Sequence, residues 1–166
     1  ALTISSLIEH AGKYHSGTMI ASVETTGGVS HSTWGEVALN ARKLAQALER
    51  LGLAQGARCG TIAWNNRRHL EIYFGVAGAG FVCHTLNPRL KPEQLIYILN
   101  HAEDEVLFID QTFVPAVAQL RAHLPKLRHV VLMGPENPEA AEQIDGLLFY
   151  DSLLSAETGQ YTWPEL

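Results

Sequence analysis

The fold is decided by residues 58–86, which read RCGTIAWNNRRHLEIYFGVAGAGFVCHTL. Residues 58–64 are mostly apolar and predict a strand, and Asn66 is a residue type that often caps the start of a helix. Residues 67–79 predict that helix, which ends at a glycine. A second apolar run, residues 81–86, predicts the next strand. Strand, helix and strand in this order indicate a βαβ unit with parallel strands.

The same alternation continues further along the chain. Pro92 suits the first turn of a helix, residues 106–109 predict a strand, residues 112–123 a helix and residues 129–133 another strand. These strands are nearly continuous apolar runs, which is typical of strands buried on both faces of a parallel sheet. We therefore expect an α/β fold with a largely parallel sheet flanked by helices.

The amino-terminal part has a different pattern. Residues 19–24 and 29–32 predict two short strands around Thr25-Thr26-Gly27-Gly28, which indicates a β hairpin. Thr33 and Glu36 have the spacing of a capping box, so a helix is expected to begin there. The apolar residues of this helix recur at steps of four and three: Val37, Ala41, Leu44, Leu48 and Leu51.

Composition excludes several classes of protein. The chain has 166 residues, of which 46% are hydrophobic and 17% charged, so it is neither disordered, collagen-like nor a coiled coil. Its net charge is −5, and the densest basic run is only residues 67–69, which argues against a nucleic-acid partner. The apolar stretch 70–86 contains Glu71 and several glycines and is too short for a membrane span. Length alone favours one domain.

Two further expectations concern the cell compartment and the chain ends. Cys59 and Cys83 lie in apolar runs, as buried reduced thiols do, so a cytoplasmic location is expected. We expect residues 1–133 to form the α/β subdomain, and residues 134–166 to form a turn-rich surface segment and a tail with a short helical turn at residues 151–154. The chain begins without Met and ends without an evident structural close, so we expect it to be cut from a longer protein.

Three short segments resemble functional sites, but the sequence around each of them favours a structural role. Residues 75–80 look like a glycine-rich dinucleotide fingerprint, but they end a helix instead of opening one, which favours close packing and a helix cap. Asn66, Arg67 and Arg68 open a helix and form a candidate anion site, with ordinary exposed arginines as the favoured alternative. Asp110 closes a strand where α/β sheets place ligands, but a turn-forming, helix-capping role is favoured because Asn65-Asn66 replace the acids of a phosphoacceptor site.

Cysteine and metal chemistry are not expected. Cys83 and His84 are neighbours on a strand and point to opposite faces, so they cannot form a thiolate–imidazole pair. The eight histidines never have the spacing of metal ligands on one helix face.

Residues 81–90, Phe-Val-Cys-His-Thr-Leu-Asn-Pro-Arg-Leu, carry a more specific pattern. Together with Trp64-Asn65 upstream and Asn100-His101-Ala102-Glu103-Asp104 downstream, this run resembles the amino-terminal portion of AMP-forming acyl-CoA synthetases, particularly the fatty-acid branch. The resemblance extends from about Ser32 to His123. Residues 32–37 are similar to the family's early helix start, and residues 77–88 are similar to its Gly-Ala to Asn-Pro core motif.

The resemblance implies an activity for a longer parent protein. Such enzymes join a carboxylic acid to CoA, using ATP and Mg²⁺, through an acyl-adenylate. The family's phosphate-cradling loop, its adenine, ribose and Mg-associated motifs and its adenylation Lys would all follow the matched segment, and none occurs in residues 1–166. We therefore expect the chain alone to be an inactive scaffold that holds no catalytic residue, binds no cofactor and holds no metal. Without those groups nothing offsets the charge that develops when a carboxylate meets a triphosphate.

Few residues of this chain are expected near a substrate. His84 and Asn87 are the two candidates for proximity to the substrate channel, with satisfied polar groups at a strand end as the favoured alternative. Residues 84–88 are expected to end a central strand. The resemblance also implies a possible homodimer in which residues 2–20 rest on a partner.

A second hypothesis belongs to a different class. The chain could be a stand-alone flavodoxin-like binding or signalling module that uses the pocket beyond Asp110 and Asn65. That hypothesis predicts a complete sheet, whereas the fragment hypothesis predicts an incomplete one.

Overall fold

The computed structural model describes residues 2–25 and 27–166 and confirms the expected α/β fold. The chain divides into two compact units. One contains residues 57–63 and 83–153 and holds nearly all of a five-stranded sheet. The other contains the rest of the chain and holds three helices and a hairpin.

The five-stranded sheet is largely parallel, as expected. Its strands are β3 (Arg58–Ile62), β4 (Val82–Thr85), β5 (Val106–Ile109), β6 (His129–Leu132) and β7 (Leu148–Phe149). They lie in the order β4-β3-β5-β6-β7, and β5 pairs in parallel with both β3 and β6, as β6 does with β7. Counted along the chain, this is the order 2-1-3-4-5 of flavodoxin-like sheets.

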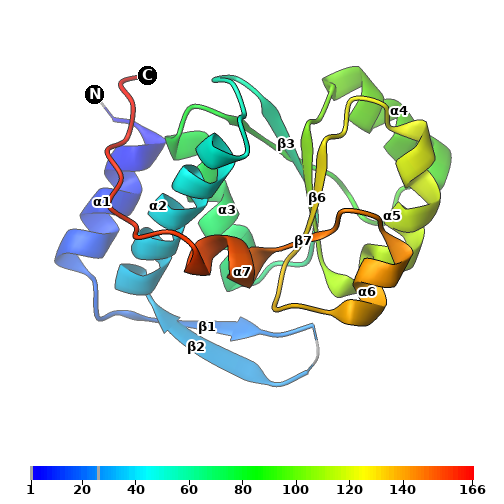
Figure 1. Cartoon of the computed structure of the whole chain (residues 1–166). Coiled ribbons are helices and arrows are strands. Elements are labelled where there is room, and N and C mark those ends of the chain that lie inside the picture. Colours follow the sequence, from blue (N-terminus) through cyan, green and yellow to red (C-terminus); the bar gives the residue numbers. More distant parts are fainter. Residues whose placement is uncertain (1, 26) are drawn as a thin grey trace. The chain divides into compact units, whose positions relative to one another are not determined.

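Three helices cover one face of this sheet (Figure 1). They are α4 (Pro92–Ala102), α5 (Val114–Leu120) and α6 (Pro138–Gln143). The expected helix over residues 112–123 is divided, because α5 is flanked by the 3-10 turns η1 (Gln111–Phe113) and η2 (Arg121–His123). Pro115 accounts for the late start, since its ring is tolerated only in the first turn of a helix.

Burial separates β4 from the strands beside it. Every residue of β5 is buried, and so is every residue of β3 and β6 except the first. In β4 no residue is fully buried, and Val82 is 46% exposed. The expectation that residues 84–88 end a central strand is wrong, because β4 is the first strand in the sheet order. It is an edge strand of the described sheet.

Residues 134–166 contain more structure than their turn-rich composition predicts. Besides α6 and β7 they include α7 (Tyr150–Ser155), which confirms the expected helical turn at residues 151–154. Tyr150 is completely buried and meets the ring of Phe108 edge to face, with centroids 6.4 Å apart. Part of this segment therefore belongs to the core of the sheet unit.

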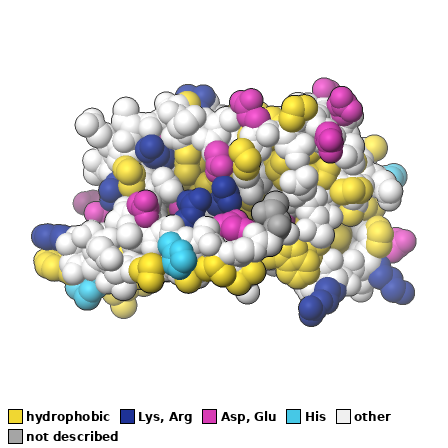
Figure 2. All heavy atoms as spheres, turned by 90° about the horizontal axis from the view of Figure 1, so that it is seen from below, with side chains coloured by type: hydrophobic (Ala, Val, Ile, Leu, Met, Phe, Trp, Pro, Cys, Tyr) yellow, Lys and Arg dark blue, Asp and Glu magenta, His cyan; other side chains and the backbone are white. Residues whose placement is uncertain are grey.

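The second unit contains α1 (Ile4–Tyr14), α2 (Trp34–Arg50), α3 (Arg67–Gly78) and the hairpin of β1 (Met19–Val23) and β2 (Val29–Thr33). The hairpin is antiparallel as expected, although Thr26 of its turn lies outside the described residues. The expected capping box is present, because Thr33 and Glu36 cap α2 reciprocally. Seen from below, hydrophobic side chains lie among polar ones on the face that carries the hairpin (Figure 2).

The glycines of α3 serve packing, as the sequence favours. A Cβ atom at Gly75 would lie 2.9 Å from the carbonyl oxygen of Ala41 in α2. Gly80 has a φ of +83°, the left-handed conformation that ends many helices. Residues 75–80 therefore bring α3 close to α2 and end it, and they do not form a nucleotide loop.

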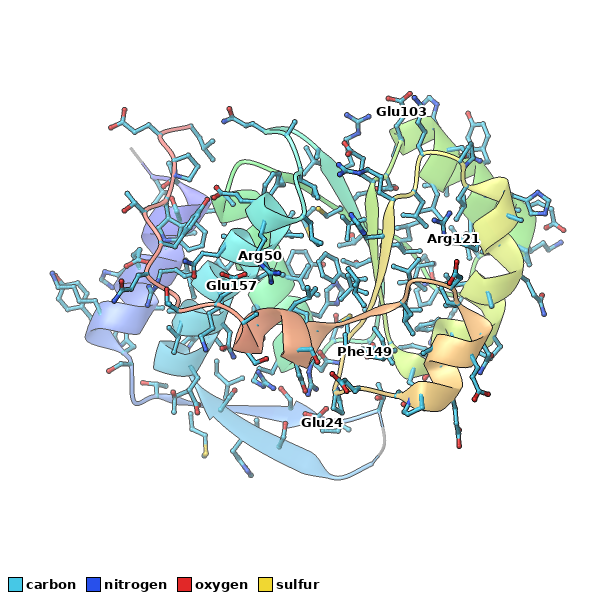
Figure 3. All side chains as sticks on the ribbon, viewed as in Figure 1. Glu24, Arg50, Glu103, Arg121, Phe149 and Glu157 are labelled. Carbon is cyan, nitrogen blue, oxygen red and sulfur yellow. The ribbon has the colours of Figure 1, made fainter. Side chains whose placement is uncertain are left out.

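The last residues of the chain run along the same unit. Arg50 of α2 and Glu157 point toward one another and form an ion pair of 2.6 Å (Figure 3). The indole of Trp163 packs against Gly78 and donates a hydrogen bond of 2.8 Å from Nε1 to Glu9 of α1. Among the described residues no helix is both long and apolar enough to cross a bilayer.

Candidate functional site

Of the two residues expected near a substrate channel, the structure places His84 in a polar contact with a residue far along the chain. Its Nδ1 lies 2.7 Å from Oδ2 of Asp104. Asp104 stands just before β5 and is 2% exposed, whereas the side chain of His84 is 25% exposed. A carboxylate can only accept, so Nδ1 donates the hydrogen bond when Asp104 is ionised.

The contact between His84 and Asp104 passes over strand β3 at the position of Gly60. In the sheet order β3 lies between β4, which carries His84, and β5, which Asp104 precedes. A Cβ atom at Gly60 of β3 would lie 3.3 Å from Cγ of Asp104 and 3.0 Å from Cδ1 of Leu107. The small residue therefore leaves the space in which the two polar side chains meet.

Asn87 plays a local role. It is exposed, its Oδ1 accepts a hydrogen bond of 3.0 Å from the backbone N–H of Arg89, and its carbonyl oxygen accepts one of 3.2 Å from Leu90. This is the pattern by which Asn stabilises a turn. His84 and Asn87 therefore do not share a polar site, and their proximity to a substrate channel stays a prediction.

An apolar cavity lies beside this turn. Its volume is about 100 Å³, and it is lined by the end of β3, the turn, α4 and the segment from η1 to α5. The turn contributes Pro88 and Leu90, and the single polar side chain in the lining is that of Gln119. This cavity is at the carboxyl end of β3, where α/β sheets commonly bind ligands.

The arginines of the candidate anion site are paired with carboxylates. Arg67 lies 2.6 Å from Oε1 of the fully buried Glu71, which also accepts a hydrogen bond of 2.8 Å from Asn40. Arg68 lies 3.5 Å from Glu24. Carboxylates of the protein itself thus neutralise both arginines. This supports ordinary structural arginines over an anion-binding site.

The two cysteines are free thiols with reduced acidity. Burial raises the pKa of Cys83 to about 11, and it also raises the pKa of Cys59, which the nearby Cys83 raises further. Because the thiolate is the nucleophile, both thiols are poor nucleophiles at neutral pH.

Asp110 and the histidines show no assembled metal centre. Asp110 is 1% exposed and shapes the turn after β5, where its carbonyl oxygen accepts a hydrogen bond from Phe113. Asp110 is the N-cap residue of η1, so the expected turn-forming role is confirmed. Within residues 2–25 and 27–166 no three His, Cys, Asp or Glu side chains are grouped to hold a metal ion.

Comparison with known proteins assigns the family. The sequence profile of a family described as "AMP-binding enzyme" matches residues 8–154. The chain belongs to the AMP-binding enzyme family. The match is longer than the segment, about Ser32 to His123, on which the sequence resemblance rests.

Relatives within the AMP-binding family include CoA ligases. The chain is 58% identical over 98% of its length to a 3-methylmercaptopropionyl-CoA ligase of Ruegeria lacuscaerulensis, and 51% identical over 99% of its length to a medium-chain-fatty-acid–CoA ligase of Ectopseudomonas oleovorans. It spans 30% of the length of each of these relatives.

Solved structures agree on the fold. The chain matches an anthranilate CoA ligase in complex with anthranoyl-AMP with a TM-score of 0.82, at 21% identity over 98% of this chain and 29% of that one. It matches acetoacetyl-CoA synthetase from Streptomyces lividans with the same TM-score, at 22% identity over 99% of this chain and 26% of that one. The fold is thus that of part of an adenylate-forming enzyme.

Sequence reasoning misses one member of the polar contact. Asp104 stands out in the sequence only as part of a family-like run, and its pairing with His84 depends on the strand order. The available signal is Gly60, an isolated glycine inside a strand pattern, which often marks a close approach of other groups.

Proposed function

We propose that this chain is part of an AMP-forming acyl-CoA ligase that activates a carboxylic acid with ATP and transfers the acyl group to CoA through an acyl-adenylate. The observation that carries the proposal is the 58% identity, over nearly the whole chain, to 3-methylmercaptopropionyl-CoA ligase. The identity of 51% to a medium-chain-fatty-acid–CoA ligase supports the same reaction class.

The proposed substrate class is an unbranched aliphatic carboxylic acid. The acids named for these two relatives differ in length and in a sulfur atom, but both are flexible chains that end in a carboxylate. The relatives named for aromatic acids are more distant, such as a 4-hydroxybenzoate–CoA/benzoate–CoA ligase at 28% identity over 70% of this chain. Sequence similarity therefore favours an aliphatic over an aromatic substrate.

This substrate assignment is tested by measuring CoA thioester formation. The polypeptide that carries the chain would be supplied with ATP, Mg²⁺, CoA and one acid at a time, from propionate and 3-methylmercaptopropionate to decanoate, with benzoate as the aromatic comparison. Activity with the aliphatic acids and little with benzoate is expected. A preference for benzoate would contradict the substrate class, and no thioester with any acid would contradict the ligase.

The chain itself is proposed to be inactive and to bind none of ATP, Mg²⁺ or CoA productively. Its two clustered arginines, Arg67 and Arg68, are already paired with carboxylates. The described residues also do not fit a metal site. The groups that stabilise the charge of the reacting phosphates are therefore assigned to the rest of the parent protein.

A stand-alone flavodoxin-like module is the second candidate, and the strand order 2-1-3-4-5 favours it. Family membership favours the ligase instead. The two differ in the reading frame that follows Leu166: a Ser/Thr/Gly-rich loop ending in Pro-Lys-Gly supports the ligase, and a stop codon supports the module.

Two further properties are proposed with the ligase. A cytoplasmic location is supported by two free cysteines, which suit a reducing compartment. A homodimer in which residues 2–20 rest on a partner is supported by Leu2, Ile4 and Leu7, whose exposed fractions are 86%, 44% and 46%. Sedimentation of wild type and Leu7→Glu tests the dimer, since a charge at that interface would shift the parent toward monomer.

A further inference from the structure

The contact between His84 and Asp104 is unequal in its exposure to solvent. Asp104 is almost completely buried, and its second oxygen, Oδ1, has no hydrogen-bond partner within the part of the chain that the structure describes. The carboxylate thus depends heavily on its 2.7 Å contact with His84. Burying an ionised carboxylate with an unsatisfied oxygen is costly, so the protonation state of this pair should affect local stability.

The other charged and titratable groups near Asp104 have partners of their own or are neutral thiols. Arg58 of β3 is the nearby cation, but its guanidinium makes an ion pair of 2.9 Å with Glu103. Glu105 pairs with Arg128 at 3.0 Å. The thiols of Cys59 and Cys83 are protonated at neutral pH because burial raises the pKa of each. His84 is therefore the group that responds most directly to the charge of Asp104.

The strand that carries His84 is weakly restrained. β4 is at the edge of the described sheet and none of its four residues is fully buried. Just beyond it, the N–H of Leu86 donates a hydrogen bond of 2.9 Å to the carbonyl oxygen of Thr61 in the β3 strand. The turn that follows supplies Pro88 and Leu90 to the apolar cavity. Any contact that fixes β4 therefore also fixes one wall of that cavity.

We propose that the His84–Asp104 contact is a protonation-dependent latch that holds β4 against β3 and so fixes the turn of residues 87–90. It closes on acidification and opens more readily as the pH rises. Opening would expose Asp104 to water and relieve the cost of its buried charge. The latch is independent of the proposed ligase activity.

The direction of the pH effect follows from the linkage between protonation and opening. Burial raises the pKa of Asp104 in the closed state, and the hydrogen bond and charge of His84 and the charge of Arg58 oppose this rise only in part. A carboxyl whose pKa is raised in the closed state favours that state when protonated, and this advantage is lost as the pH rises through the raised pKa.

Hydrogen–deuterium exchange of the Leu86 amide, read by NMR on the 166-residue chain, tests the latch. The protection factor is corrected for the intrinsic pH dependence of exchange. As the pH rises from about 4, near the ordinary pKa of an aspartate, to about 8, it is expected to fall several-fold, with a limit of about tenfold per pH unit for one linked proton. The amides of Asp110 and Met133, which bond within the interior strands of the same sheet, serve as internal references and should keep their protection.

Variants separate the latch from a general loss of stability. Asp104→Asn, which keeps the shape without the charge, should abolish the pH dependence at Leu86, whereas Glu103→Gln, which alters an exposed neighbouring carboxylate, should keep it. If Asp104→Asn does not fold, His84→Gln should lower Leu86 protection and make its fall with pH steeper, because the hydrogen bond and charge that oppose the raised pKa of Asp104 are lost. A wild-type profile without pH dependence, or one that persists in Asp104→Asn, would overturn the proposal.

Discussion

Glu71 is completely buried in α3, and its Oε1 lies 2.6 Å from the guanidinium of Arg67, one helical turn earlier. The same distance separates Arg50 from Glu157 in the same unit, where the side chain of Glu157 is 12% exposed. The two pairs differ in burial: the side chain of Arg67 is 22% exposed and that of Arg50 is 53% exposed. Because of this difference, we expect the loss of Arg67 to destabilise the fold more than the loss of Arg50 does.

Arg67→Ala should be strongly destabilising. Removing the cation leaves the charge of Glu71 in a buried site, which typically costs about 3 kcal/mol or more of unfolding free energy. Arg50→Ala, the control, should cost less than Arg67→Ala, because the side chain of Arg50 is 53% exposed and water can reach the carboxylate of Glu157 in its place. Urea denaturation of both variants measures the difference, and equal costs would refute this reading of the Glu71 site.

Gly75→Ala should also be destabilising, although alanine favours helices. The added Cβ would lie 2.9 Å from the carbonyl oxygen of Ala41 and 3.0 Å from Leu44, so α2 and α3 would have to separate. A loss of about 1–3 kcal/mol is expected from such overpacking. Gly17→Ala is the control, because nothing lies within 4 Å of the position that a Cβ atom would take there. A stabilised Gly75→Ala chain would show that close packing of the two helices does not matter.

Trp163 should anchor the carboxyl-terminal tail. Its ring packs on Gly78, and its Nε1 donates to Glu9, which also pairs with Arg42 at 2.7 Å. We expect Trp163→Ala to cost about 2 kcal/mol, since the ring is only partly buried. Trp163→Phe keeps most of the packing and loses the hydrogen bond, so it should cost about 1 kcal/mol. If thermal unfolding shows that Trp163→Phe is less stable than Trp163→Ala, packing of the ring contributes less than its hydrogen bond, against this expectation.

His69 should make the fold less stable in acid. Burial lowers its pKa below the ordinary value of 6.5, and a hydrogen bond with the backbone of Trp64 opposes this shift. A histidine with a lowered folded-state pKa contributes stability that is present above the unfolded pKa and is lost as the pH falls toward the folded one. The unfolding midpoint should therefore decline between about pH 7 and pH 5, and less steeply in His69→Gln. The exposed His101→Gln is the control and should leave the slope unchanged.

Local features of this fold are predictable because they depend on neighbouring residues. Thr33 with Glu36, and Asn66 at the start of α3, cap helices where the sequence expects them. The βαβ alternation likewise indicates the α/β class. The helix expected over residues 112–123 is shorter in the structure, and Pro115 explains its later start.

Features that depend on strand order are not predictable in this way. The family resemblance leads us to expect that residues 84–88 end a central strand, yet β4 lies at the edge of the described sheet. The partner of His84 is twenty positions along the chain and reaches it across β3. β7 has only two residues, too few for a pattern to reveal it. The sequence therefore locates the candidate site in part, through His84, but does not assemble it.

ATP–pyrophosphate exchange in the presence of an aliphatic acid tests the proposed function most directly. It would be measured for the 166-residue chain and for the polypeptide that carries it, at equal concentration. Exchange by the longer polypeptide and none by the chain is the predicted result. Exchange by the chain alone, or none by the longer polypeptide with any carboxylic acid, would contradict it.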